Sequence, residues 1–307
     1  MLMGAARKTR EFEDEMENLW GPYGADSECG VLRQVLMHVP GDELALVSRD
    51  NFEDWLFMEM VDADRLRAQV QNLIRVYESH GVDVRLVQKQ RSDRPNAMFV
   101  RDLMLTTHQG VVLARPGHPV RRGEERAVAE TLATLGMPIL RSIAGEGTYD
   151  GACAMLVDRD LALVATSPRT NQAGADQVTD ALAAIGVGTV IRCSTPWNQI
   201  HLDGCMNVVD RRTVVINPWQ MPYDAVTALK TADVRIIEAT ALDELPGAGL
   251  NFVAIRPGFV IIPEGFPASE RLLKAHGIEF EAVAVDEVLK AGGEMHCLTG
   301  VLRRDPL

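Results

Sequence analysis

A cysteine late in the chain stands in a setting that suits a nucleophile. Cys297 follows the paired glycines Gly292 and Gly293, and no other cysteine lies near it in the sequence. Glycine lets the backbone approach a ligand closely, and a thiol attacks only as the thiolate, which needs a base or a positive environment. An isolated cysteine is also commonly a small buried hydrophobic residue, so Cys297 alone does not identify a site.

Three distant segments contain the other groups that such a thiol requires. If His201-Leu202-Asp203 is extended, its two polar side chains share one face, with an imidazole for proton transfer beside a carboxylate for a cationic substrate. Asp102 and Asp150 each precede an apolar, β-rich stretch, a position that turn-forming aspartates also favour. Cysteine, histidine and three carboxylates are together the groups expected for attack on a cationic carbon.

Composition and charge narrow the class of protein. The chain has 307 residues, of which 47% are hydrophobic and 24% charged, as in ordinary globular proteins. A formal charge of −12 argues against nucleic acid as a partner and suits small cations. Residues 1–17 lack the apolar core of a signal peptide, and no run reaches the roughly 20 apolar residues of a membrane span. The five cysteines are scattered and include no Cys-x-x-Cys pair. We therefore expect a cytoplasmic protein.

The elements that must position these residues follow a repeating pattern of two β stretches, an amphipathic helix and another β stretch. Helices are expected at 63–80, 124–135, 175–185, 224–231 and 268–276, and each is followed by a strand, at 82–87, 138–140, 187–191, 234–237 and 280–285. The paired strands before four of them are expected at 103–108 with 111–114, 155–157 with 161–165, 206–209 with 213–216, and 251–255 with 259–262. A spacing of about 45–60 residues predicts five units that could close into a ring around one central site.

The whole chain, 1–307, is expected to be one catalytic domain, because no linker or charge run divides it. A generic open α/β sheet is the alternative, but no Gly-x-Gly-x-x-Gly or Walker loop supports a nucleotide site. In a closed ring, four residues near strand starts of different units would converge: Asp102, Asp150, His201 and Cys297.

Five motifs, in order, resemble those of the guanidine-modifying enzyme superfamily. That group includes arginine deiminases, dimethylarginine hydrolases, arginine dihydrolases and amidinotransferases. The motifs are Asn96-Ala97-Met98-Phe99-Val100-Arg101-Asp102, Tyr149-Asp150-Gly151-Ala152-Cys153, Ser167-Pro168-Arg169-Thr170-Asn171, His201-Leu202-Asp203 and Gly292 to Thr299. One such motif alone is weak evidence for a family, whereas five motifs in the order of the family are strong evidence.

The resemblance implies a fold and a set of roles. The fold would be a five-bladed α/β propeller (pentein fold) of ββαβ repeats with pseudo-fivefold symmetry, and neither a metal nor an organic cofactor is needed. Cys297 would be the nucleophile and His201 the general acid and base, with Asp150 orienting His201 and stabilising its charge. Asp102 and Asp203 would bind the guanidinium nitrogens.

The chemistry calls for this set of groups. A guanidinium carbon is a poor electrophile, so two carboxylates must hold the cation planar with its carbon over the sulfur, and the cation in turn favours the thiolate. His201 would protonate the departing nitrogen to leave an amidino-thioether on Cys297, which a second nucleophile would then release. Two positions depart from the common family pattern: Cys153 stands where many relatives have a second carboxylate, and residue 150 is Asp rather than Glu.

An amino-acid substrate also needs groups that bind its carboxylate. Family members use an asparagine six residues before the aspartate, which Asn96 matches, and an arginine that Arg169 matches. Arg121 or Arg122 is a further candidate, of which we choose Arg122, although a solvated helix start is the alternative for this pair. We expect arginine or an N-substituted arginine as the substrate.

A hydrolase is the expected function. Loss of ammonia or of an alkylamine would give citrulline, and a second hydrolysis would give ornithine. An amidinotransferase, in which an amine replaces water, is the alternative, and a non-catalytic propeller used for binding is the alternative of another class. We expect a small guanidine as the partner and no nucleic acid or membrane, and leave the formation of a homo-oligomer open.

Overall fold

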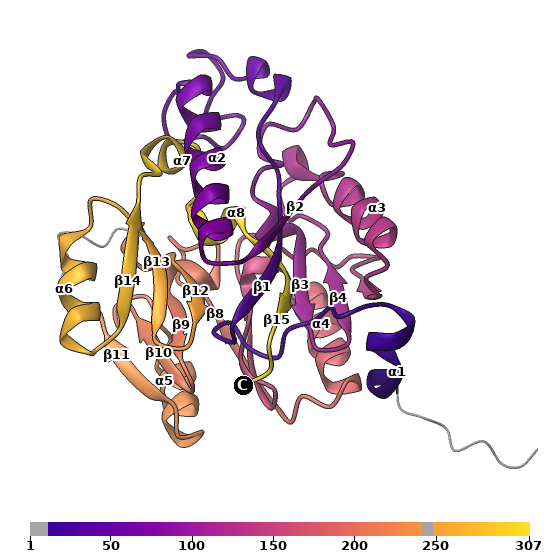
Figure 1. Ribbon diagram of the computed structural model, residues 1–307, viewed down its shortest axis with the longest axis vertical. Helices are drawn as coiled ribbons and strands as arrows, with labels where there is room; N and C mark the ends of the chain where they lie inside the picture. The colour runs from indigo at the N-terminus through magenta and orange to yellow at the C-terminus, as the bar shows by residue number, and fades with distance from the viewer. Residues whose placement is uncertain (1–11, 241–247) are drawn as a thin grey trace, which may run out of the picture.

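The structure is a computed structural model that describes residues 12–240 and 248–307. Residues 1–11 of the charged N-terminal segment lie outside the described residues. The described part of the chain forms five three-stranded sheets of one design (Figure 1).

Four of the sheets are built from consecutive elements. In each, an antiparallel pair of strands is followed by a helix and by a third strand that runs parallel to the second. The first is β3 (Met104–Thr107), β4 (Gly110–Leu113), α3 (Glu125–Leu135) and β5 (Ile139–Ser142). The second is β6 (Ala154–Asp158), β7 (Leu161–Thr166), α4 (Gln172–Ala184) and β8 (Thr189–Ser194). The third is β9 (Met206–Asp210), β10 (Thr213–Ile216), α5 (Tyr223–Thr231) and β11 (Arg235–Glu238), and the fourth is β12 (Val253–Arg256), β13 (Phe259–Pro263), α6 (Pro267–Ala275) and β14 (Glu279–Val283).

The fifth sheet joins the two ends of the described chain. Its strands are β1 (Leu32–Met37), β2 (Asp83–Leu86) and β15 (Gly300–Arg304), and α2 (Ala63–Ser79) connects β1 to β2. Strand β15 runs antiparallel to β1, with Leu32 opposite Arg304. The sequence analysis did not expect β15, which completes this sheet with the same arrangement of strands as the others. Figure 1 shows β15 beside β1, with α2, α3, α5 and α6 toward the outside of the molecule.

The five expected helices are confirmed, with small shifts at their ends. Helix α2 begins after Asp62, whose carboxylate accepts hydrogen bonds from two backbone N–H groups of the first turn. Its buried side chains recur every three or four residues, as an amphipathic helix requires: Leu66, Val70, Leu73 and Tyr77. Helix α4 starts earlier than expected, at Gln172, because the Asn171 side chain caps it by accepting from the N–H of Gly174.

The core lies between the sheets and the inner faces of the helices. The strands β3, β4, β9 and β10 are almost wholly buried, which explains their apolar sequences. Cys29, Cys193 and Cys205 pack in one of the buried apolar clusters. Among the described residues, no helix combines the length and the apolar character needed to cross a bilayer.

A short helical turn precedes the first strand of each of the four consecutive sheets, and another precedes β15 in the fifth sheet. These turns are η2 (Val100–Leu103), η4 (Gly151–Cys153), η5 (Leu202–Gly204), η7 (Ala248–Leu250) and α8 (Met295–Leu298). They lie together in space: η2 contacts η4 and α8, and η5 contacts η4 and η7. The remaining short elements are α1 (Phe12–Leu19), η1 (Asp42–Leu46), η3 (Pro119–Arg121) and α7 (Asp286–Lys290).

The condition that residues 201–203 be extended, under which His201 and Asp203 would share a face, is not met. His201 itself is extended, with φ −134° and ψ 153°, but the chain turns into η5 at Leu202. Asp203 therefore does not share a strand face with His201. Asp102, Asp150, His201 and Cys297 lie on or beside short helical turns that precede the strands, near the strand starts at which the repeat pattern placed them.

Candidate active site

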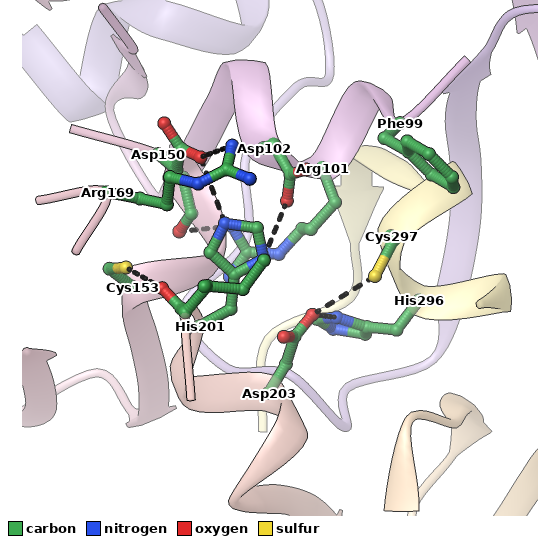
Figure 2. A network of polar contacts seen from close by, with 12 residues as sticks. Phe99, Arg101, Asp102, Asp150, Cys153, Arg169, His201, Asp203, His296 and Cys297 are labelled. Atoms are coloured by element: carbon green, nitrogen blue, oxygen red, sulfur yellow. Dashed lines mark hydrogen bonds and ion pairs between the residues drawn. The ribbon is translucent and has the colours of Figure 1, made fainter. Parts of the chain in front are cut away.

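An imidazole lies between two carboxylates at the meeting point of η2, η4 and η5. His201 Nε2 is 3.0 Å from Asp150 Oδ2, and His201 Nδ1 is 3.5 Å from Asp102 Oδ1 (Figure 2). All three side chains are buried. Because each ring nitrogen faces a carboxylate oxygen, this arrangement favours the doubly protonated imidazolium.

The Asp150 side chain is held on its other side as well. Its Oδ1 accepts a hydrogen bond from the N–H of Gly117 at 2.9 Å, and the Asp150 N–H donates to Thr170 Oγ1 at 3.1 Å. Asn171 Oδ1 accepts from the N–H of Thr148. The Ser167–Asn171 motif therefore fixes the segment that carries Asp150.

The thiol of Cys297 lies across from His201, on α8. Its Sγ is 3.9 Å from Asp203 Oδ2 and 3.4 Å from Asn251 Nδ2. Asn251 also orients the turn, because its Oδ1 accepts the N–H of His296 at 3.0 Å. Figure 2 shows Cys297 and Asp203 pointing toward each other, with His296 behind them.

Buried ion pairs support this arrangement from behind. His296 Nδ1 is 2.8 Å from Asp203 Oδ2, and His296 Nε2 is 3.6 Å from a carboxylate oxygen of Glu28. Glu28 in turn accepts from Arg101, whose guanidinium also donates to the carbonyl of Gly151. The arginine of the Asn96–Asp102 motif is thus a buried link between η2 and η4.

Close backbone packing explains two of the motif glycines. A Cβ on Gly151 would lie 2.4 Å from the carbonyl oxygen of Arg101, so η2 and η4 approach this closely only with glycine there. A Cβ on Gly293 would lie 2.3 Å from the ring of Phe99. The Gly292–Gly293 pair therefore lets the segment before Cys297 pack against the Asn96–Asp102 motif.

A cavity of about 450 Å³ opens beside Cys297 and His201. Asn96, Asp102, Arg121 and Arg169 line it, together with Phe57 and other apolar side chains. A second cavity of about 430 Å³ shares Cys297 and His201 with the first. Its own lining residues include Asp203, Asn251 and Glu294. The thiol and the imidazole thus stand where the two cavities meet.

The structure brings Arg121, rather than Arg122, to the wall of the first cavity. Arg121 is buried, and its Nη1 is 2.5 Å from Asp102 Oδ2 while its Nε and Nη2 donate to Glu124 Oε2. Arg122 is exposed and donates to the carbonyls of Pro116 and Gly117. The choice of Arg122 from the sequence is therefore corrected in favour of its neighbour.

Two further expected residues also line the first cavity. Asn96 is buried and donates through Nδ2 to the carbonyl of Trp55 at 2.6 Å. The Arg169 guanidinium lies 3.7 Å from Asp150 Oδ2. Cys153 is buried beside them, with its Sγ 3.3 Å from Ser167 Oγ, so a thiol–hydroxyl contact fills the place of the second family carboxylate.

Charge and burial shift the protonation of the central groups. Burial by itself would lower the pKa of His201, but the Asp102 charge and the Asp150 hydrogen bond outweigh it and raise that pKa. Burial opposes ionisation of Asp150 and Asp203, yet their histidine partners lower both pKa values. Burial, followed by the charges of Asp203 and Asp102, raises the pKa of Cys297 well above the usual thiol value. These shifts favour a protonated imidazole and a neutral thiol in the unliganded site.

One group of described residues has the spacing of a metal site. Ligand atoms of Asp102, Asp150 and His201 lie within 4.8 Å of one another. However, Arg121 and Arg169 contact the same two carboxylates, and a second cation there would meet their positive charge. The arrangement suits an organic cation that sits beside the carboxylates better than a metal ion between them.

The sequence analysis missed Asn251, Glu294 and the supporting role of His296. Asn251 directly follows η7 in the fourth consecutive unit, so the repeat itself was the signal that pointed to it. Glu294 stands inside the Gly292–Thr299 motif, next to residues that were already singled out.

Comparisons with known proteins agree with this geometry. A family model described as N,N dimethylarginine dimethylhydrolase, eukaryotic, matches residues 50–304. This chain belongs to that family. It is 26% identical over 227 residues to the N(G),N(G)-dimethylarginine dimethylaminohydrolase of Pseudomonas aeruginosa, an alignment that covers 74% of this chain and 84% of the relative.

Solved structures show that the dimethylarginine dimethylhydrolase family fold extends over most of the chain. The Pseudomonas aeruginosa enzyme, as a Cys-to-Ser mutant complexed with citrulline, superposes with a TM-score of 0.73 and 22% identity over 88% of this chain and 99% of its own. SxtG, an amidinotransferase from Microseira wollei, superposes with a TM-score of 0.77 and 18% identity over 93% of this chain and 98% of its own. The resemblance to the guanidine-modifying superfamily is thereby confirmed.

Proposed function

We propose that this protein is a cysteine-dependent hydrolase of the guanidinium group of arginine or an N-substituted arginine, with citrulline as the product. One observation carries the proposal: Cys297 and His201 stand where two cavities meet, and each cavity presents one buried aspartate, Asp102 or Asp203. Support comes from the family and from the relative that was crystallised with citrulline.

The two aspartates bind the guanidinium in this proposal. Asp102 Oδ1 is buried and has no hydrogen bond among the described residues, since His201 Nδ1 lies 3.5 Å away, so this oxygen can also accept a substrate N–H. Asp203 Oδ2 lies near the sulfur. A cation held between both carboxylates has its carbon over Sγ, and its positive charge lowers the pKa of the thiol.

The covalent steps follow from the protonation states. When the cation binds, the Cys297 thiol releases its proton to solvent, and the thiolate attacks the guanidinium carbon. The carbon–nitrogen bond then breaks as His201 gives its proton to the departing amine. The neutral imidazole then takes a proton from water, which attacks the amidino-thioether. The carbon–sulfur bond breaks, the thiolate returns, and citrulline leaves. Asp150 acts throughout as the partner that keeps His201 oriented and charged.

The amino-acid end of the substrate occupies the first cavity. Arg169 binds the carboxylate, because Asp150 neutralises only part of its charge at 3.7 Å. Arg121 is more fully compensated by Asp102 and Glu124, and so contributes by holding Asp102 in place. Asn96 adds a polar group on the same wall.

The same proposal includes the architecture. The five sheets are taken as blades of one α/β propeller (pentein fold) with pseudo-fivefold symmetry, and residues 1–307 as one catalytic domain. The support is the shared ββαβ order of four units and the matching arrangement that β15, β1, α2 and β2 complete.

An amidinotransferase is the second candidate. Two observations favour it: the TM-score of 0.77 to SxtG, and a second cavity beside the thiol in which an acceptor amine has room. In that reaction the amine would replace water as the second nucleophile, and His201 would take its proton.

Product analysis separates these reactions. The protein is incubated with isotopically labelled arginine and, separately, with methylated arginines, and the products are identified by mass spectrometry. Citrulline supports the hydrolase, ornithine indicates a second hydrolysis, and turnover only after an amine is added supports the amidinotransferase. The Cys297→Ser variant should lose turnover and keep its circular dichroism spectrum, since the change is nearly isosteric; residual activity above a few per cent of the parent would exclude Cys297 as the nucleophile.

A further inference from the structure

The second cavity contains a buried acid that the proposed steps do not use. Glu294 lines this cavity and is 6% exposed. Its Oε2 is buried and has no hydrogen-bond partner among the described residues. An unpartnered buried carboxyl oxygen is costly, so its presence beside the reacting thiol calls for an explanation.

The surroundings of Glu294 are those of a binding site for a positively charged nitrogen. Asp203 and Asn251 line the same cavity from η5 and from the residue after η7, and Asn198 and Gln199 add two side-chain amides. No arginine or lysine is among the described residues that line it. The first cavity, by contrast, contains Arg121 and Arg169. The two cavities therefore differ in charge and select opposite ends of a substrate.

We infer that the second cavity binds the departing amine of an N-substituted arginine, and that Glu294 selects an amine with a second, positively charged nitrogen. This inference rests on the proposed function. Arg169 holds the amino-acid end in the first cavity, so the substituted guanidinium nitrogen, on the far side of the carbon above Cys297, faces the second cavity. An amine that leaves from this nitrogen departs past Asp203 toward Glu294.

The size of the cavity fits such an amine. Its volume of about 430 Å³ greatly exceeds the space of about 30 Å³ that one water molecule takes in the liquid. Ammonia or dimethylamine would leave much of it to solvent and would leave Glu294 without a partner. A substituent of two or three carbons that ends in an ammonium group would occupy more of the cavity with its carbon chain. Its ammonium group would donate a hydrogen bond to Glu294 Oε2.

The protonation of Glu294 suits a site that waits for a cation. Burial, and then the nearby charge of Asp203, raise the pKa of Glu294 well above the usual value of a carboxyl. In the empty cavity this shift favours the neutral acid, which avoids repulsion from Asp203. A bound ammonium group would favour the carboxylate and would be held by a charge-assisted hydrogen bond.

The test compares two substrates of the same shape. Nω-(2-aminoethyl)arginine and Nω-propylarginine differ only in whether the substituent ends in an ammonium or a methyl group. The parent protein should have a kcat/KM about tenfold or more higher for the aminoethyl compound, as one charge-assisted hydrogen bond provides. Glu294→Gln, which keeps the shape, should reduce this preference to about twofold or less. Glu264→Gln, at an exposed position, is the matched control and should keep the parental preference.

A binding measurement makes the inference testable without turnover. Calorimetry with the free amines 1,2-diaminoethane and propylamine should show the diamine to bind more tightly to the parent protein and to Glu264→Gln, but not to Glu294→Gln. If neither substrate reacts and yet the diamine preference depends on Glu294, the proposed hydrolysis fails and the cavity assignment stands. Equal kcat/KM values for the two substrates, or a preference that survives in Glu294→Gln, would overturn the inference and leave Asp203 as the group that selects the cation.

Discussion

Replacing Asp150 by asparagine tests the central pair of the site. Asp150 Oδ1 accepts the Gly117 N–H, and an asparagine oxygen keeps that bond. Its amide nitrogen then faces His201 Nε2, where the carboxylate oxygen lies at 3.0 Å in the parent. A donor in this place favours the neutral imidazole, and the nearby charge of Arg169, no longer balanced by Asp150, adds to the effect.

The size of the change follows from the lost hydrogen bond. A hydrogen bond to a charged group contributes about 1.5–3 kcal/mol, and 1.36 kcal/mol corresponds to one pKa unit, so the pKa of His201 should fall by about 1–2 units. The proposed mechanism needs protonated His201 as the acid. The charge of Asp102 and the hydrogen bond to Asp150 raise the pKa of His201, and Asp150→Asn should therefore move the alkaline limb of kcat/KM to lower pH by about the same 1–2 units.

The assay is citrulline formation as a function of pH, together with an imidazole titration followed by NMR. Asp160→Asn, at an exposed position, is the matched control and should leave both curves unchanged. An unchanged alkaline limb and an unchanged His201 titration in Asp150→Asn would refute the view that Asp150 sets the charge of the imidazole. If the variant is too slow to assay, the NMR titration alone decides.

Three other substitutions test the surrounding charges. Asp203→Asn removes a carboxylate 3.9 Å from the Cys297 sulfur, so the pKa of the thiol should fall. Alkylation of the unliganded protein by iodoacetamide at pH 8 should then become about tenfold faster or more. An equal or slower rate would contradict the view that Asp203 raises the pKa of this thiol. Asp102→Asn should weaken binding of a guanidine ligand by about 2 kcal/mol or more, measured by calorimetry, and unchanged affinity would make Asp102 purely structural. Glu124→Ala removes a buried ion-pair partner of Arg121 and should lower the free energy of unfolding, measured in urea, by about 3 kcal/mol. A loss well below 1 kcal/mol would show that Asp102 alone compensates the charge of Arg121.

The helices and most strands could be predicted because their physical causes are local. The apolar spacing in α2 and the alternating β stretches follow from short windows of sequence. Strand β15 could not be found in this way, since its partner β1 lies at the other end of the chain and only the pairing identifies it as part of a sheet. The start of α4 was missed by three residues because its cap, Asn171, was assigned to the motif alone.

The candidate site shows the same division. The motifs predicted that Asp102, Asp150 and His201 belong to one site. They could not predict which side chain of a neighbouring pair points into it, because that depends on the local backbone. Arg121 and Arg122 are neighbours, and only the turn η3, which ends at Arg121, decides which of them faces inward. Whether the chain is extended after His201 could not be decided from the sequence for a similar reason, because a turn of three residues leaves no periodicity to detect.

The pairing of β15 with β1 has a consequence for the order in which activity arises. Synthesis runs from the N-terminus, so the loops that carry Asp102, Asp150 and His201 leave the ribosome long before Cys297, which lies in the turn just ahead of β15. A nascent chain of this length thus contains the proposed acid and the proposed substrate carboxylates but not Cys297, the proposed nucleophile. Joining β15 to β1 closes a loop over almost the whole chain, at an entropic cost that grows only with the logarithm of its length. The same late pairing that completes the fifth sheet also brings Cys297 into place, so a translation product interrupted before this point would lack the proposed nucleophile.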